Sequence, residues 1–175
     1  MMELTSLFDK NRVPLNKVVD KYSKLNDGEY ITIVHTCLFN HNGEMLIQKR
    51  SLNKVDQPGK WDISSGGGVK VGEAIWEAAE RELYEELGIK YNFSNERVFL
   101  TVHYDRGFDD YYLIAVDKNI DEFIIDNEEV LEIKWASKEL ILAMIQNNEF
   151  IKYNEGFIEL LFAMFNNRGT YPRKE

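Results

Sequence analysis

Three glutamates stand close together near the end of an expected helix, and their spacing points to chemistry. They are Glu82, Glu85 and Glu86, in the stretch ERELYEELGI. Like charges four residues apart on a helix repel at a cost on the order of a few tenths of a kcal/mol. A divalent cation would compensate for this repulsion, since hard carboxylate oxygens at this spacing suit Mg²⁺ or Mn²⁺.

The helix that must carry these glutamates has its apolar residues on one side. The expected core face consists of Ile75, Trp76, Ala79, Leu83 and Leu87. The three glutamates lie beside this apolar arc instead of opposite it, so their carboxylates can converge at the edge of the core. Taken alone, ELYEEL is also typical of a solvated surface face.

A run of three glycines precedes the helix. Gly66, Gly67 and Gly68 leave the backbone without side chains, so that a carbonyl or N–H can approach a metal ion or a phosphate closely. Taken alone, three glycines usually indicate a turn. At the other end, Gly88 stands where a left-handed C-terminal cap is expected.

Two charged residues complete the segment. Glu73 stands in or just before the first turn of the helix. Arg81 sits among the glutamates, where its guanidinium can hold one carboxylate through a two-pronged pair.

The rest of the chain predicts a mixed β-sheet covered by helices, because strands and hairpins come first and helices follow. Strands are expected at 30–39, 45–50, 61–64, 97–104, 110–116 and 130–137, with Asn42-Gly43 as a hairpin turn. Helices are expected over 138–146, capped by Ser137, and over roughly 156–167. Residues 1–175 are expected to form a single domain, with 1–25 as an N-terminal β-hairpin extension and 150–175 containing a C-terminal helix.

Composition restricts the partners. The formal net charge is -9, which disfavours a nucleic acid polymer or an anionic membrane, and no apolar run approaches membrane-spanning length. An anionic substrate would therefore need a metal ion or a local basic patch. Cys37 is the only cysteine, so no internal disulfide can form, and the N-terminus has no signal-peptide pattern. These features favour a cytoplasmic location.

The glycines, glutamates and arginine fit one long pattern. The segment from Gly67 to Ile89 resembles the Nudix box, GX5EX7REUXEEXGU with U an aliphatic residue, and every fixed position matches. The stretches MLIQKRS, PGKWDISSGG and EIKWAS also resemble the Nudix scaffold around the box. The resemblance covers roughly residues 30 to 140.

The resemblance implies an α/β/α sandwich with a mixed sheet, in which the box forms a loop–helix–loop. It also implies Mg²⁺-dependent cleavage of a phosphoanhydride bond in a nucleoside diphosphate linked to another moiety, or in another organic diphosphate, with Mn²⁺ as an alternative ion. By position, Glu85 and Glu86 would be the principal metal ligands, with the Gly66 carbonyl as a further one. Glu82 would be a ligand or the base that activates water.

The remaining box residues have supporting roles by the same comparison. Arg81 would orient a glutamate, and Glu73 would support the loop and sometimes contact the metal through water. Gly67, Glu73 and Gly88 are the structural positions of the box. Neither the number of metal ions nor the substrate follows from the spacing.

The resemblance also implies that an acidic residue outside the box supplies a metal ligand or a base, and basic residues outside the box could meet the phosphates. The acidic candidates, which compete with Glu82 for the role of base, are Asp109, Asp110, Glu128 and Glu129. Each could equally be a solvated loop charge. Lys49, Arg50 and Lys54 in QKRSLNK could bind substrate phosphates, or could merely balance local charge. His35 and Cys37 are expected to be a packed histidine and a buried thiol.

Two other functions compete with hydrolysis. The stretch LIQKRS…PGKWDISSGG also resembles the branch that contains isopentenyl diphosphate isomerase, but the isomerase cysteine corresponds here to Gly66. The other alternative is a non-catalytic nucleotide-binding Nudix sensor, which a degenerate box would favour. The N-terminal hairpin and the apolar C-terminal helix could form a homodimer interface.

Overall fold

The computed structural model describes residues 3–169, and these form two compact units. Unit 1 is built from the chain up to Thr36, from Gly66–Tyr84 and from Lys90–Tyr112; unit 2 is built from Cys37–Ser65, Glu85–Ile89 and the chain from Leu113 on. The elements in chain order are β1 (Leu4–Phe8), β2 (Pro14–Asp20), β3 (Ile31–Phe39), β4 (Met45–Arg50), β5 (Trp61–Ile63), β6 (Ser65–Gly68), α1 (Ile75–Leu87), β7 (Leu100–Tyr104), β8 (Gly107–Ala115), η1 (Ile120–Glu122), β9 (Val130–Ala136), α2 (Lys138–Gln146) and α3 (Glu155–Asn166).

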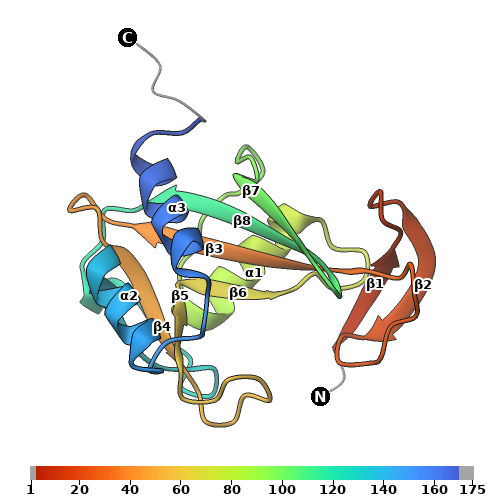
Figure 1. The fold of residues 1–175 in the computed structure, drawn as a ribbon, viewed down its shortest axis with the longest axis horizontal. Helices are drawn as coiled ribbons and strands as arrows, with labels where there is room; N and C mark the ends of the chain where they lie inside the picture. The colour runs from red at the N-terminus through yellow and green to blue at the C-terminus, as the bar shows by residue number, and fades with distance from the viewer. Residues whose placement is uncertain (1–2, 170–175) are drawn as a thin grey trace. The chain divides into compact units, whose positions relative to one another are not determined.

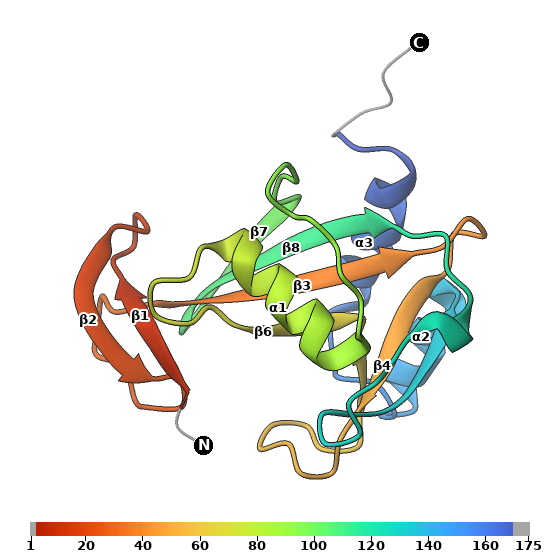
Figure 2. The same ribbon diagram turned by 180° about the vertical axis from the view of Figure 1, so that it is seen from behind.

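Unit 1 contains two antiparallel strand pairs and most of α1. β1 pairs with β2 in the N-terminal hairpin, and β7 pairs with β8 across a tight turn (Figure 1). The glycines of β6 lead through a loop into α1 (Figure 2). Thr5 of β1 donates its hydroxyl to the Val69 carbonyl at 2.8 Å, and its backbone bridges to Lys70. The hairpin is therefore attached directly to the loop that precedes α1.

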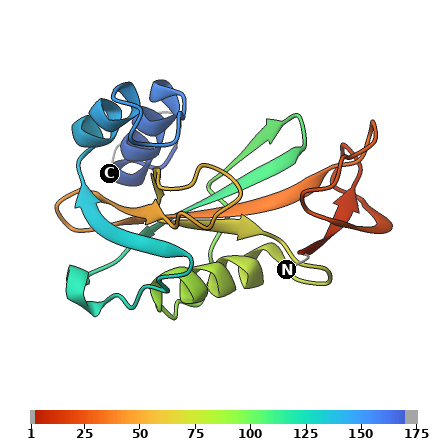
Figure 3. The ribbon, with the colours of Figure 1, turned by 90° about the horizontal axis from the view of Figure 1, so that it is seen from below.

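Unit 2 is organised around β4. This strand pairs antiparallel with both β5 and β9. At its start, Met45 pairs with Phe39 at the end of β3. α2 and α3 contact each other (Figure 3) and bury the side chains of Ile141, Met144, Ile158 and Leu161. The core of this unit is thus formed by the apolar residues of β4 and the buried faces of these two helices.

The expected α/β fold class is confirmed. In residues 3–169 the main sheet has seven strands, with the path β5-β4-β3-β8-β7, while β6 pairs with β3 and β9 pairs with β4. Among the same residues no helix is both long and apolar enough to cross a lipid bilayer.

Most element boundaries follow the sequence pattern, with three corrections in the strands. α2 covers 138–146 as predicted, and Ser137 caps it by accepting a hydrogen bond from the Leu140 N–H. The sequence did not predict a strand at the glycines, but 65–68 form β6. β7 begins at Leu100 instead of 97, and β8 begins at Gly107 instead of 110. Gly107 makes the longer β8 feasible, since a Cβ there would lie 1.9 Å from the Ile31 carbonyl oxygen.

Candidate functional site

Arg81 is the centre of a hydrogen-bond network in unit 1 that joins the glycine loop to α1. Its guanidinium donates to both oxygens of Glu73, at 2.7 and 2.9 Å, and to the Gly68 carbonyl at 2.9 Å. It also donates to Glu82 at 2.5 Å. The expected two-pronged pair therefore forms with Glu73, and the same guanidinium restrains Glu82.

The pKa values in this network follow from the pairing. Burial alone would lower the pKa of Arg81, but the hydrogen bonds and charges of Glu73 and Glu82 outweigh burial and raise it. Burial alone would raise the pKa of Glu73, but Arg81 and the Lys70 N–H outweigh burial and lower it. Both groups are therefore held in their charged forms.

Two glycines in unit 1 allow side chains to touch the backbone of the loop. A Cβ at Gly67 would lie 2.2 Å from the carboxylate carbon of Glu82, so Glu82 occupies the space that any other residue would fill. A Cβ at Gly66 would lie 2.6 Å from Nδ1 of His35. The imidazole of His35 stacks on Tyr111, with ring centroids 4.6 Å apart, and its Nε2 lies 3.6 Å from Asp109.

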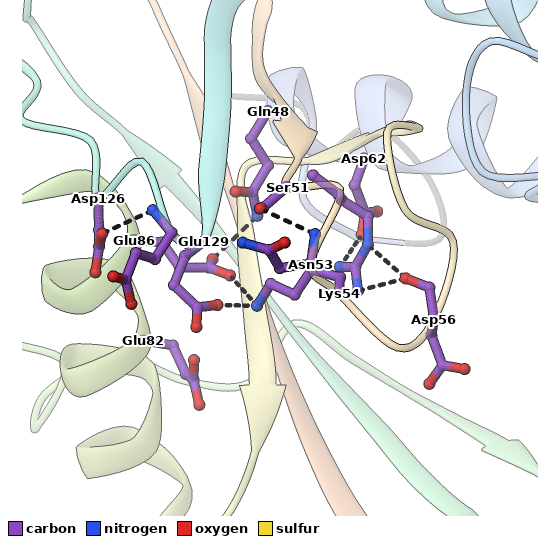
Figure 4. Close-up of polar contacts among 12 residues, drawn as sticks. Gln48, Ser51, Asn53, Lys54, Asp56, Asp62, Glu82, Glu86, Asp126 and Glu129 are labelled. Carbon is purple, nitrogen blue, oxygen red and sulfur yellow. Dashed lines mark hydrogen bonds and ion pairs between the residues drawn. The ribbon is translucent and has the colours of Figure 1, made fainter. Parts of the chain in front are cut away.

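Glu86 lies in unit 2 and is buried, with only 2% of its surface exposed. Gln48 of β4 donates from Nε2 to one carboxylate oxygen of Glu86 at 3.0 Å. The Lys54 ammonium lies 3.9 Å from the other oxygen and also contacts Glu129 (Figure 4). A buried carboxylate is thus held by an amide on one side and a cation on the other.

The three glutamates of α1 differ in exposure. The side chain of Glu82 is 15% exposed and Glu86 is almost fully buried, whereas Glu85 is exposed. Among residues 3–169 no group of three or more histidine, cysteine, aspartate or glutamate side chains is gathered closely enough to hold a metal ion. The carboxylates of Glu82 and Glu86 are instead engaged by Arg81 and Lys54.

The expected core face of α1 needs correction in its first turn, where Ile75 is only half-buried and Trp76 is exposed. Leu83, Leu87 and Ala79 are buried as expected, but 37% of Trp76 is exposed. Trp76 lines an open cavity of about 910 Å³ in unit 1, together with Glu77, Glu80, Arg81, Tyr84, Lys90, Tyr91, Asn92 and Ser94. A single helical wheel overestimated the apolar arc, because an aromatic ring can also cover the rim of a surface groove.

The basic candidates all lie in unit 2, at or after the end of β4. Arg50 donates to Asp62 at 3.2 Å and to the Asp56 carbonyl at 3.0 and 3.1 Å. Lys49 is half-buried, and its backbone is paired with those of Trp61 and Glu132. Of the three, Lys54 is placed beside a carboxylate of the box.

The acidic candidates outside the box have different surroundings. Asp110 is fully buried and accepts hydrogen bonds from Arg12 and Thr101. Glu128 is exposed, whereas the carboxylate of Glu129 lies at Lys54. Cys37 is buried as expected, and burial raises the pKa of its thiol.

Sequence reasoning missed Gln48. This residue is 2% exposed, and its Oε1 has no hydrogen-bond partner in the part of the chain that the structure describes. The signal was one polar amide inside the otherwise apolar start of MLIQKR, since a buried amide needs a partner. That partner is Glu86, which lies 38 residues away in the sequence.

Comparison with known proteins decides the family. The NUDIX domain model matches residues 30–156. A Nudix hydrolase of Listeria innocua is 38% identical over 165 residues, which cover 94% of this chain and 96% of the relative. The chain belongs to the Nudix hydrolase family. The expectation from the box is therefore confirmed.

This Nudix hydrolase is also similar to an isomerase and to a solved structure. An isopentenyl-diphosphate Delta-isomerase of Photorhabdus laumondii is 29% identical over 157 residues, 84% of each chain. The crystal structure of DR0079 from Deinococcus radiodurans superposes with a TM-score of 0.74 at 24% identity, covering 91% of this chain and 97% of that one. The latter supports the Nudix fold alone. Hydrolysis of a pyrophosphate bond is the general activity of the family.

Proposed function

We propose that this Nudix hydrolase uses Mg²⁺, or Mn²⁺ in its place, to cleave a phosphoanhydride bond. The substrate class would be a nucleoside diphosphate linked to another moiety, or another organic diphosphate. The observation that supports the proposal most directly is the position and burial of two box glutamates. Glu82 lies against the bare backbone of Gly67, and Glu86 is a buried carboxylate fixed by Gln48.

The box glutamates offer the type of ligand atom that a hard divalent ion prefers. Carboxylate oxygens are the ligands that Mg²⁺ and Mn²⁺ prefer, and a buried carboxylate such as Glu86 requires a cation nearby. Glu82, Glu85 and Glu86 would hold the ion, with the Gly66 carbonyl as a further ligand. A bound ion would neutralise charge on the diphosphate and lower the pKa of a coordinated water.

The other residues would position these groups. Arg81 restrains Glu82 and ties the loop to α1 through Glu73 and Gly68. Glu82 would accept a proton from the attacking water or bind the metal. Glu129 competes with it for the role of base and is favoured over Asp110, whose carboxylate is already bonded to Arg12 and Thr101.

The phosphates would be met by Lys49, Arg50 and Lys54. A local basic group is needed because the whole chain carries a net charge of -9. Arg50 is held in place by Asp62, so we expect it to contribute a fixed charge at the end of β4. A cytoplasmic location and a homodimer remain predictions from the sequence.

The isomerase alternative is disfavoured by the packing around Gly66. A cysteine at this position would bring its Cβ to 2.6 Å from His35, so the imidazole would have to move. The sensor alternative is disfavoured by the complete set of box carboxylates. A substrate with an isoprenoid tail remains compatible with hydrolysis.

A phosphate-release screen with Mg²⁺ and Mn²⁺ tests the proposal. It would include nucleoside diphosphates and triphosphates, nucleotide sugars, dinucleotide polyphosphates, and isopentenyl and dimethylallyl diphosphate, each with and without added phosphatase. We expect activity that Glu85→Gln abolishes and that Glu159→Gln, an exposed substitution on α3, leaves unchanged. Binding of a panel member without turnover would instead support the sensor.

A further inference from the structure

Lys54 in unit 2 bridges two carboxylates that come from distant parts of the sequence. Its ammonium contacts Glu129, which precedes β9, and lies 3.9 Å from Oε1 of Glu86 on α1. Gln48 holds the other oxygen of Glu86 at 3.0 Å. We call Gln48, Lys54, Glu86 and Glu129 the Lys54 cluster (Figure 4).

Backbone hydrogen bonds fix the positions of the three segments that meet in the Lys54 cluster. The Ser51 N–H donates to the Glu129 carbonyl at 3.0 Å, and the Lys54 N–H donates to the Ser51 carbonyl at 3.3 Å. The Asp126 N–H reaches the Glu86 carbonyl at 3.4 Å. These backbone hydrogen bonds therefore hold the segments that carry Lys54 and the two carboxylates close together.

The charges in the Lys54 cluster do not balance. Two carboxylates face one ammonium, and Glu86 is only 2% exposed, so its charge is shielded little by water. The Oε1 of Gln48 is also buried, without a hydrogen-bond partner in residues 3–169. A divalent ion at this point would carry a charge equal to that of both carboxylates, whereas an ammonium carries half as much.

We propose that Lys54 is a resident counter-ion that occupies the place of a divalent metal between Glu86 and Glu129. In the metal-free protein the ammonium keeps the two carboxylates together. A divalent ion displaces it, Glu129 becomes an acidic ligand from outside the Nudix box, and the released ammonium is available to a substrate phosphate. This inference rests on the proposed function, because it requires that Glu86 binds metal.

Mn²⁺ binding, followed by electron paramagnetic resonance of the free ion, tests the inference without any substrate. Lys54→Met removes the competing cation and should lower the Kd for Mn²⁺ by about tenfold or more, whereas Glu129→Gln should raise it at least as much. The matched control is Lys60→Met, in the same loop, whose ammonium contacts the Asn148 carbonyl instead of a carboxylate. The control should leave the Kd unchanged.

A second readout uses wild-type protein, so it does not depend on whether a variant folds. Acetylation of Lys54, followed by mass spectrometry, should become several-fold faster when Mg²⁺ is added, while acetylation of Lys60 stays constant. An unchanged Mn²⁺ Kd in Lys54→Met, or an unchanged acetylation rate of Lys54, would overturn the inference. Wild-type protein that binds neither ion would overturn the proposed function itself and the inference with it.

Discussion

At the scale of single residues, Arg81 and Lys54 have matching roles, because each cation lies beside two carboxylates. Arg81 is bonded to Glu73 and Glu82 in unit 1, and Lys54 contacts Glu86 and Glu129 in unit 2. Each cation therefore compensates for the charge of one of the crowded box glutamates, Glu82 in the case of Arg81 and Glu86 in the case of Lys54. The crowded carboxylates are tolerated because cations are held beside them.

The Glu73–Arg81 pair gives stability a defined pH dependence. The pKa of Glu73 is lowered in the folded protein, so its contribution is present above its ordinary value of 4.5 and is lost as pH falls through the lower folded value. Glu73→Ala should reduce the free energy of unfolding by about 2 kcal/mol at pH 7, since charge-assisted hydrogen bonds are lost. Urea unfolding measures this loss.

The loss caused by Glu73→Ala should shrink when unfolding is repeated at a low pH, as the pH falls from 4.5 through the lower folded pKa of Glu73, because the carboxylate is then becoming protonated in the wild type as well. Glu159→Ala, at an exposed position of α3, is the control and should change stability little at either pH. An equal loss for Glu73→Ala at both pH values would show that the Glu73 charge does not stabilise the loop.

At the scale of elements, the C-terminal end of α1 is fixed by Gly88. Its φ of 67° is the left-handed conformation that was predicted for a helix cap. A Cβ at Gly88 would lie 2.8 Å from both Cβ and the carbonyl oxygen of Ile124. The Ile124 N–H donates to the Leu87 carbonyl at 3.0 Å, so the cap also anchors the loop that leads to Glu129.

Gly88→Ala should therefore destabilise unit 2 through two effects. The left-handed backbone costs about 1 kcal/mol for a residue with a side chain, and the contact with Ile124 adds to this. Gly72→Ala is the matched control, because Gly72 also has a positive φ of 78° but has nothing within 4 Å of its Cβ position. Thermal unfolding should show a larger loss for Gly88→Ala. Equal losses would mean that Ile124 moves away without cost.

The sequence predicted most of the helix caps and helix boundaries, since these features depend on local patterns. The cap at Gly88, the Ser137 cap and the α2 boundaries all follow from residues within a few positions. The sequence did not predict β6, because strand pairing compensates for the poor strand propensity of Gly66–Gly68. Two features depend on contacts between distant segments, which one sequence does not reveal. They are the hydrogen bond from Gln48 to Glu86 and the placement of Lys54 beside Glu129 instead of Glu128.

At the scale of the molecule, the N-terminal hairpin is part of unit 1. Arg12, which lies in the turn between β1 and β2 with a φ of 64°, donates to the buried carboxylate of Asp110 on β8. Thr5 binds the Val69 carbonyl of the loop before α1. The hairpin is therefore connected both to β8 and to the Nudix loop.

Arg12→Ala should cost about 3–5 kcal/mol in the free energy of unfolding, because Asp110 would remain buried with its charge uncompensated. Arg12→Met combined with Asp110→Asn should lose much less, since no charge is then left unpaired. Lys10→Ala, at an exposed position of the same turn, is the control. Chemical denaturation measures all three. A loss below about 1 kcal/mol for Arg12→Ala would contradict the importance of the pair.

The central claim is that box carboxylates and a divalent ion direct water onto a phosphorus atom. Turnover of a substrate from the screen in ¹⁸O-labelled water with Mg²⁺, followed by mass spectrometry of the products, tests it most directly. We predict that one ¹⁸O atom enters a phosphate-containing product and that no labelled product forms without the metal. Label in a non-phosphate product, or labelled phosphate without a divalent ion, would contradict the claim.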